Sequence, residues 1–112
     1  MTTHLPHGDR AILDIRKLRE YCLSPTHPRG RHKARVFRQA LGLRQDDAEW
    51  LRNALLDAAA EGEAMSIAVD AWGTQWRLDV TLRRHHTTAV VRTVWLVRTG
   101  DDLPRFVTCW VV

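Results

Sequence analysis

Residues 26–37 read Thr-His-Pro-Arg-Gly-Arg-His-Lys-Ala-Arg-Val-Phe, and this stretch joins a rigid turn to the start of a helix. Pro25 and Pro28 restrict their own backbone and push the residues before them toward extended conformations, so no helix can run through them. His27 is therefore expected to be extended at the entrance of the next helix. Gly30 permits a close turn there.

A helix is predicted from about residue 31 to residue 41, and Gly42 supplies its C-terminal stop. On a helical wheel, Lys33 lies on the same apolar stripe as Phe37, one turn earlier. Two interpretations of Lys33 stay open. Its ammonium group snorkels to water, or it reaches a cleft beside His27 at the start of the helix.

Two more helices are predicted on either side of this one. A helix over about 14–23 begins with Asp14 as its N-cap and packs inward through Leu18 and Tyr21. Another helix over about 46–60 begins with an acidic capping signature and is strongly amphipathic.

From residue 63 onward, the spacing of the apolar residues changes from helical to alternating, which is typical of strands. The four predicted strands span about 65–69, 76–82, 89–98 and 105–112. Short turns join them, so they form an antiparallel meander. The predicted fold class is α+β, with three N-terminal helices followed by a four-stranded antiparallel β-meander. Residues 1–10 are expected to be a flexible lead-in, and residues 11–112 a single domain.

Closing the second hairpin at His85-His86 sets a register that can be tested. It places Trp76 opposite Trp95 and Asp79 opposite Arg92, and both pairs are favourable across strands. One face then carries the predicted core residues Trp76, Leu78, Val80, Val91, Trp95, Phe106 and Trp110. The other face carries Arg77, Asp79, Thr81, Arg92, Arg98 and Arg105, together with Val90, Val94, Leu96, Val107 and Val111.

The chain has a formal charge of +4, which favours anionic partners such as nucleic acid or an acidic protein. Six cationic residues and no acidic residue lie between Glu20 and Asp46: Arg29, Arg31, Lys33, Arg35, Arg38 and Arg44. Cys22 and Cys109 lack the spacing of a zinc site and are expected to be reduced and buried. The polar N-terminus has no signal-peptide core and no window approaches a membrane span, so we expect a cytoplasmic protein without membrane contact.

Three series of residues resemble an uncharacterised bacterial domain family, whose members occur as free-standing proteins and as C-terminal tips of polymorphic toxins. The series are Asp14, Lys17, Leu18, Tyr21 and Leu23; then His27, Pro28, Gly30, Lys33, Ala34 and Phe37; then Ala40 to Gly42. The stretches 76–79, 91–95 and 98–105 fit the same pattern. In element order, the chain is also similar to the barnase, EndoU, colicin-nuclease and RelE group of ribonuclease toxins. No delivery segment precedes the resemblance, which favours a free-standing protein of the cytoplasm.

The resemblance raises the expectation of RNA cleavage, a reaction that needs a base, an acid and cations for the phosphorane. The candidate catalytic residues are His27, Lys33, Arg92 and Asp79. His27 can titrate near neutrality, Lys33 and Arg92 can hold phosphate, and Asp79 can orient Arg92 or a histidine. We expect the first three to share one anion-sized hollow. With a base, an acid and cations, the reaction requires no metal or other cofactor, and the histidines lack the spacing and the clustered carboxylates or cysteines of a metal site.

Each assignment has a structural alternative, and together these describe a non-catalytic binding module. His27 can simply bond a helix end, and Asp79 and Arg92 can be a structural pair of the sheet. The candidate nucleic-acid-binding residues are Arg29, Arg31, Arg35, Arg77 and Arg98, since such contacts position a backbone without reading its sequence. The expected partners are RNA and a cognate acidic inhibitor protein, an antitoxin or an immunity protein.

Overall fold

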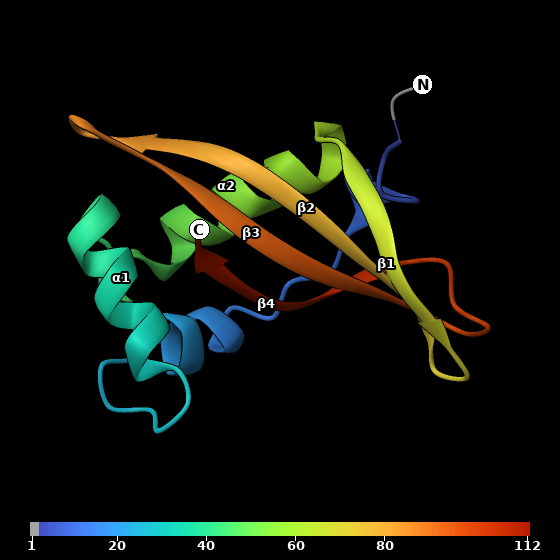
Figure 1. The fold of residues 1–112 in the computed structure, drawn as a ribbon, viewed down its shortest axis with the longest axis horizontal. Coiled ribbons are helices and arrows are strands. Elements are labelled where there is room, and N and C mark those ends of the chain that lie inside the picture. The colour runs from blue at the N-terminus through green and yellow to red at the C-terminus, as the bar shows by residue number, and fades with distance from the viewer. Residues whose placement is uncertain (1–2) are drawn as a thin grey trace.

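The computed structural model describes residues 3–112 of the chain. Two α-helices precede four strands (Figure 1): α1 Arg31–Leu41, α2 Ala48–Glu61, β1 Ala64–Asp70, β2 Gly73–Arg84, β3 Thr87–Arg98 and β4 Pro104–Val111. Single turns of 3₁₀-helix lie at Gly8–Arg10 and Gln45–Asp47, and a π-helical turn lies at Leu18–Cys22. The α+β class and the four-stranded antiparallel sheet agree with the prediction, but the number of helices does not.

The prediction of three helices ahead of the sheet is wrong, because residues 14–23 form only a short helical stretch around the π turn Leu18–Cys22 instead of a full α-helix. Ile12 forms a parallel bridge with Arg105 of β4, and the N–H of Phe106 donates to the Ile12 carbonyl at 2.9 Å. The helical part is limited to the π turn, which the N–H of Leu23 closes by donating to the Leu18 carbonyl at 2.8 Å.

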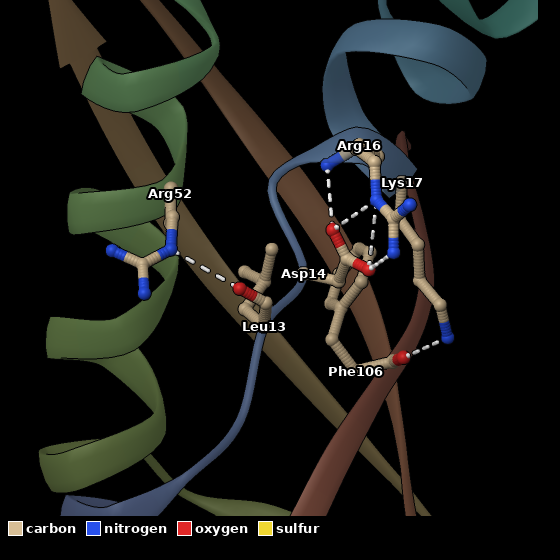
Figure 2. Close-up of polar contacts among 6 residues, drawn as sticks. All are labelled: Leu13, Asp14, Arg16, Lys17, Arg52 and Phe106. Carbon is tan, nitrogen blue, oxygen red and sulfur yellow. Dashed lines mark hydrogen bonds and ion pairs between the residues drawn. The ribbon is translucent and has the colours of Figure 1, made fainter.

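Long side chains hold residues 13–17 between α2 and β4 (Figure 2). Arg52 of α2 donates through Nε to the Leu13 carbonyl at 3.1 Å, and Lys17 donates through Nζ to the Phe106 carbonyl at 2.7 Å. Asp14, expected to cap a helix, accepts from the backbone N–H of Arg16 at 3.0 Å and also pairs with its guanidinium. The Arg16 hydrogen bonds lower the pKa of Asp14 to about 2.

Helix α1 has the predicted bounds, and both of its ends follow from the sequence. Gly42 adopts a left-handed backbone with φ 65°, and its N–H donates to the Arg38 carbonyl at 2.9 Å. Glycine adopts this left-handed conformation at the end of a helix at little cost in free energy, because it has no Cβ. Ala34, Phe37 and Leu41 form the buried face. Helix α2 begins at Ala48, after a 3₁₀ turn in which Asp47 accepts from the N–H of Arg44 at 2.9 Å.

The sheet has the order β1-β2-β3-β4, and the predicted register is confirmed. Trp76 pairs with Trp95, and Asp79 pairs with Arg92. In Figure 1, α2 runs behind β2 and β3, while α1 lies beside the end of the sheet at which β4 finishes. The buried side chains between these layers form one core around Trp95, Phe106 and Phe37. Within the described residues 3–112, no helix lies on the opposite face of the sheet.

The prediction that Trp110 lies in the core is wrong, because β4 contains an irregularity. The β3–β4 register shifts between Val94 and Trp95, so Phe106 pairs with Trp95 but Trp110 pairs with Arg92. An extra residue in one strand moves the following side chains to the opposite face. Val111 packs against the core instead.

Residues 3–10, part of the expected flexible lead-in, lie against the start of β1 and the end of α2. The N–H of Ala64 donates to the Thr3 carbonyl at 2.8 Å, and His4 forms an antiparallel bridge with Glu63. Leu5 is only 4% exposed and belongs to the core. Within residues 3–112, no helix combines the length and the apolar character needed to cross a membrane.

Candidate functional site

Lys33 projects from the first turns of α1 toward the edge strand β4. Its Nζ donates to Thr108 Oγ1 at 3.0 Å and lies 5.1 Å from the ring centroid of Tyr21 and 5.3 Å from that of Trp110. A cation over two ring faces is held by their quadrupoles. Among residues 3–112, no ion pair joins Lys33 to a carboxylate. Its ammonium group therefore keeps an uncompensated positive charge in a partly buried place.

His27 also packs against Tyr21. The centroids of the two rings are 4.7 Å apart, and the rings meet edge-on. The backbone N–H groups of Arg29 and Gly30 donate to His27 Nδ1 at 3.0 and 3.1 Å. Because Nδ1 accepts both, the neutral ring carries its proton on Nε2. His27 thus bonds a helix end, as the structural alternative expected, and it offers one N–H outward.

Gly30 is what lets this turn sit on Tyr21. A Cβ built on Gly30 would overlap the carbonyl oxygen of Tyr21, and Gly30 is buried. Only glycine permits so close an approach of two backbones. The π turn that carries Tyr21 and the turn that carries His27 are therefore packed as one unit at the N-terminal end of α1.

Arg92 and Asp79 form a two-bond ion pair on the face of the sheet that no helix covers. Arg92 Nε and a terminal guanidinium nitrogen donate to the two Asp79 oxygens, each at 3.0 Å. The side chains are 29% and 33% exposed. The hydrogen bond to Asp79 raises the pKa of the Arg92 guanidinium further above its ordinary value. The pair is accessible, and its carboxylate keeps lone pairs beyond those given to Arg92.

The expected single hollow shared by His27, Lys33 and Arg92 is not what the structure shows. Lys33 lines a hollow of about 430 Å³ with His32, Val36, Trp110 and Val111. His27 lines a neighbouring one of about 520 Å³ with Tyr21, Val107, Asp14, Arg16, Lys17 and Glu20. Aromatic residues connect the three groups: the Tyr21 ring contacts both His27 and Lys33, and Trp110, whose ring contacts Lys33, pairs with Arg92 across β4 and β3. The arrangement is a row across β2, β3, β4 and α1.

The predicted nucleic-acid-binding arginines fall in separate places. Arg29 is exposed in the turn beside His27, and Arg31 and Arg35 line a groove on another flank of α1. Arg77 is on the open face of the sheet, with a guanidinium nitrogen 3.0 Å from Met65 Sδ. Arg98 pairs with Gly73 at the far end of β3, six residues from Arg92, or about 20 Å along the strand.

Cys22 contacts the same threonine as Lys33, and both cysteines are free and buried, as predicted. Its Sγ is 3.9 Å from Thr108 Oγ1, the same hydroxyl that accepts from Lys33. Hydrogen bonds from Cys109 and Thr108, helped by the Lys33 charge, lower the pKa of Cys22 to about 7 against burial. Burial raises the pKa of Cys109.

Sequence reasoning missed three residues of this row. Tyr21 was expected only to pack, Thr108 was not singled out, and Trp110 was assigned to the core. The shift in β4 carries Trp110 to the Arg92 side, and alternation of residue types gives no sign of such a shift. Tyr21 had a signal, because it belongs to the same motif as His27 and Lys33.

A family model described as a domain of unknown function (DUF6883) matches residues 4–112. No curated protein and no solved structure matches the chain. The match covers the row of site residues and all four strands. It supports the resemblance to an uncharacterised domain family.

Proposed function

We propose that this chain, which belongs to the DUF6883 family, binds single-stranded RNA across the row of Arg92, Trp110 and Lys33 and cleaves it without a metal ion. The observation that carries the proposal is the ammonium group of Lys33. It lies between two aromatic rings with no ion-pair partner among residues 3–112. Cations beside exposed rings suit single strands, since phosphates bind the cations and bases stack on the rings.

The row supplies each group that cleavage by the neighbouring 2′-hydroxyl needs. Asp79 accepts the 2′-hydroxyl proton through a lone pair that Arg92 leaves free, and the 2′ oxygen attacks phosphorus. When the Lys33 side chain moves from Thr108 toward Arg92, the two cations stabilise the charge of the phosphorane. Lys33 gives a proton to the departing 5′ oxygen. The P–O5′ bond breaks, and the products are a 2′,3′-cyclic phosphate and a 5′-hydroxyl.

His27 has a narrower role in this proposal than a general base. Its Nδ1 already accepts two backbone N–H groups, so the neutral ring has no free lone pair to take a proton. The Nε2–H can donate to a phosphate oxygen of the same strand. In this role, His27 and Arg29 position the RNA.

A second candidate function is RNA binding without cleavage. The two-bond pairing of Arg92 with Asp79 and the use of His27 Nδ1 as a helix cap favour it. The same surface would then serve as a docking site, with salt-sensitive affinity and no products.

Cleavage in vitro separates the two candidates. Labelled RNA is incubated with the purified chain in excess chelator, and the ends are tested for 2′,3′-cyclic phosphate. We expect cleavage by the wild type, and a loss of about 100-fold or more in Lys33→Met and Asp79→Asn. Arg83→Gln removes an exposed charge from the end of β2 and is the matched control. Intact RNA with the folded wild type would reject the enzyme and leave the binding module.

A ribonuclease of this kind would act as a toxin in the cytoplasm, where RNA is exposed to it. Expression should slow the growth of a bacterial host, and Lys33→Met should relieve the effect while the protein still accumulates. A cognate acidic inhibitor protein, acting as an antitoxin or immunity partner, would cover the cationic row by charge complementarity. Equal growth arrest by the wild type and Lys33→Met would argue against this role.

A further inference from the structure

A groove of about 420 Å³ runs along α1 on a different flank from Lys33. Three arginines on successive turns of α1 line it, at positions i, i+4 and i+7, and Arg44 joins them from the loop after the helix: Arg31, Arg35, Arg38 and Arg44. Lys33 is two residues from both Arg31 and Arg35, and residues so spaced do not face each other on a helix. The groove is thus separate from the Lys33 row.

The four guanidinium groups lack anionic partners. All four residues are exposed, and within residues 3–112 no ion pair joins any of them to a carboxylate. Asp46 is the one acidic residue that lines the groove, together with Gln45. Four cations against one carboxylate leave a net positive hollow, and their mutual repulsion is relieved by a bound polyanion.

The floor of the groove argues for a phosphate backbone over an amphipathic peptide. Leu23, Ala34 and Leu43 line it but are only 2%, 5% and 1% exposed. A peptide helix needs an apolar seat for its anchor side chains. Pro25 is the exposed apolar residue of the lining, and the three buried residues add almost no accessible apolar surface to it. The accessible groups are guanidinium forks, which match phosphate oxygens with two parallel hydrogen bonds. No aromatic side chain lines the groove, so bases have nothing to stack on.

We infer that this groove is a second, sequence-independent binding site for the phosphate backbone of single-stranded RNA, and that it favours long substrates. The inference rests on the proposed function, because it extends the strand bound at Lys33. The exposed turn with Arg29 connects the two sites around the N-terminal end of α1. Arg31 to Arg38 spans about 10 Å of helix axis, enough for neighbouring phosphates of one strand.

Binding of labelled oligo-uridine with 2′-O-methyl groups tests the inference without cleavage. We compare chains of about four and about sixteen nucleotides, the range of single-strand site sizes in small domains. Arg35→Gln/Arg38→Gln should weaken binding of the long chain by about tenfold or more. It should also reduce the salt slope by about 1.4, or about 0.7 for each lost phosphate contact. The short chain should bind almost as before.

Arg10→Gln/Arg83→Gln is the matched control, because it removes the same charge from exposed positions outside the groove. Arg31→Gln/Arg44→Gln changes the other two arginines and should reproduce the defect. Unchanged affinity and salt slope in both groove variants, with normal thermal melting, would overturn the inference. Arginine-dependent binding of poly-glutamate without any effect on RNA would assign the groove to an acidic protein instead.

The inference and the proposed function fail separately. If the groove variants bind RNA normally but Lys33→Met loses cleavage, the second site is rejected and the ribonuclease stands. If the wild type cleaves nothing but the groove variants lose long-chain affinity, the second site stands without the enzyme.

Discussion

At the scale of single residues, the account depends on where Lys33 places its charge. One interpretation of the sequence was that the Lys33 ammonium group reaches water. In the structure, this group donates to Thr108 and faces the rings of Tyr21 and Trp110. That position has a second effect, because the Thr108 hydroxyl also contacts the Cys22 thiol. The titration of Cys22 therefore reports on the Lys33 charge without any ligand.

Cys22 should ionise with a pKa of about 7 instead of the ordinary 9.0. Hydrogen bonds from Cys109 and Thr108 stabilise the thiolate, and so does the Lys33 ammonium group. The ultraviolet absorbance of the thiolate should appear as pH rises through neutrality. Lys33→Met should move the midpoint upward, Lys17→Met should not, and Cys22→Ser should abolish it. A midpoint at the ordinary value in the wild type would contradict the thiol arrangement.

At the scale of elements, the best-predicted parts are those whose first and last residues are determined by the residues nearby in the sequence. Prolines, Gly30 and Gly42 set the bounds of α1, and alternation set the β2–β3 register to the residue. Two features of the fold were not predicted from the sequence. The helix expected over residues 14–23 was limited to a short stretch around a π turn packed near β4, and β4 shifted its register at Val94. Both depend on which distant strand a segment meets.

The shift in β4 predicts unequal roles for two tryptophans. Trp95 is fully buried, so Trp95→Ala should lower the free energy of unfolding by about 3–5 kcal/mol. Trp110 is only half-buried and lies outside the core, so Trp110→Ala should cost less than half as much. It should instead weaken binding of oligo-uridine, since stacking on a ring contributes about 1–3 kcal/mol. Urea unfolding and fluorescence anisotropy measure the two effects. Equal destabilisation by both substitutions would contradict this placement and show that Trp110 belongs to the core.

At the scale of the whole molecule, the helices cover one face of the sheet and leave the other open beside the cationic end of α1. The sequence indicated the members of the candidate site better than their arrangement. His27, Lys33, Asp79 and Arg92 were chosen by chemistry, but the structure sets them in a row linked by rings instead of around one hollow. Such a row suits an extended strand more than a small anion.

The most direct test is to follow side-chain NMR signals while a non-cleavable 2′-O-methyl RNA is added. The account predicts that the Lys33 ammonium, the Trp110 indole N–H and the Arg92 guanidinium shift together, with one affinity that falls as salt is raised. Shifts confined to the far end of β3 or to α2, with the Lys33 and Trp110 signals unmoved at saturation, would contradict it.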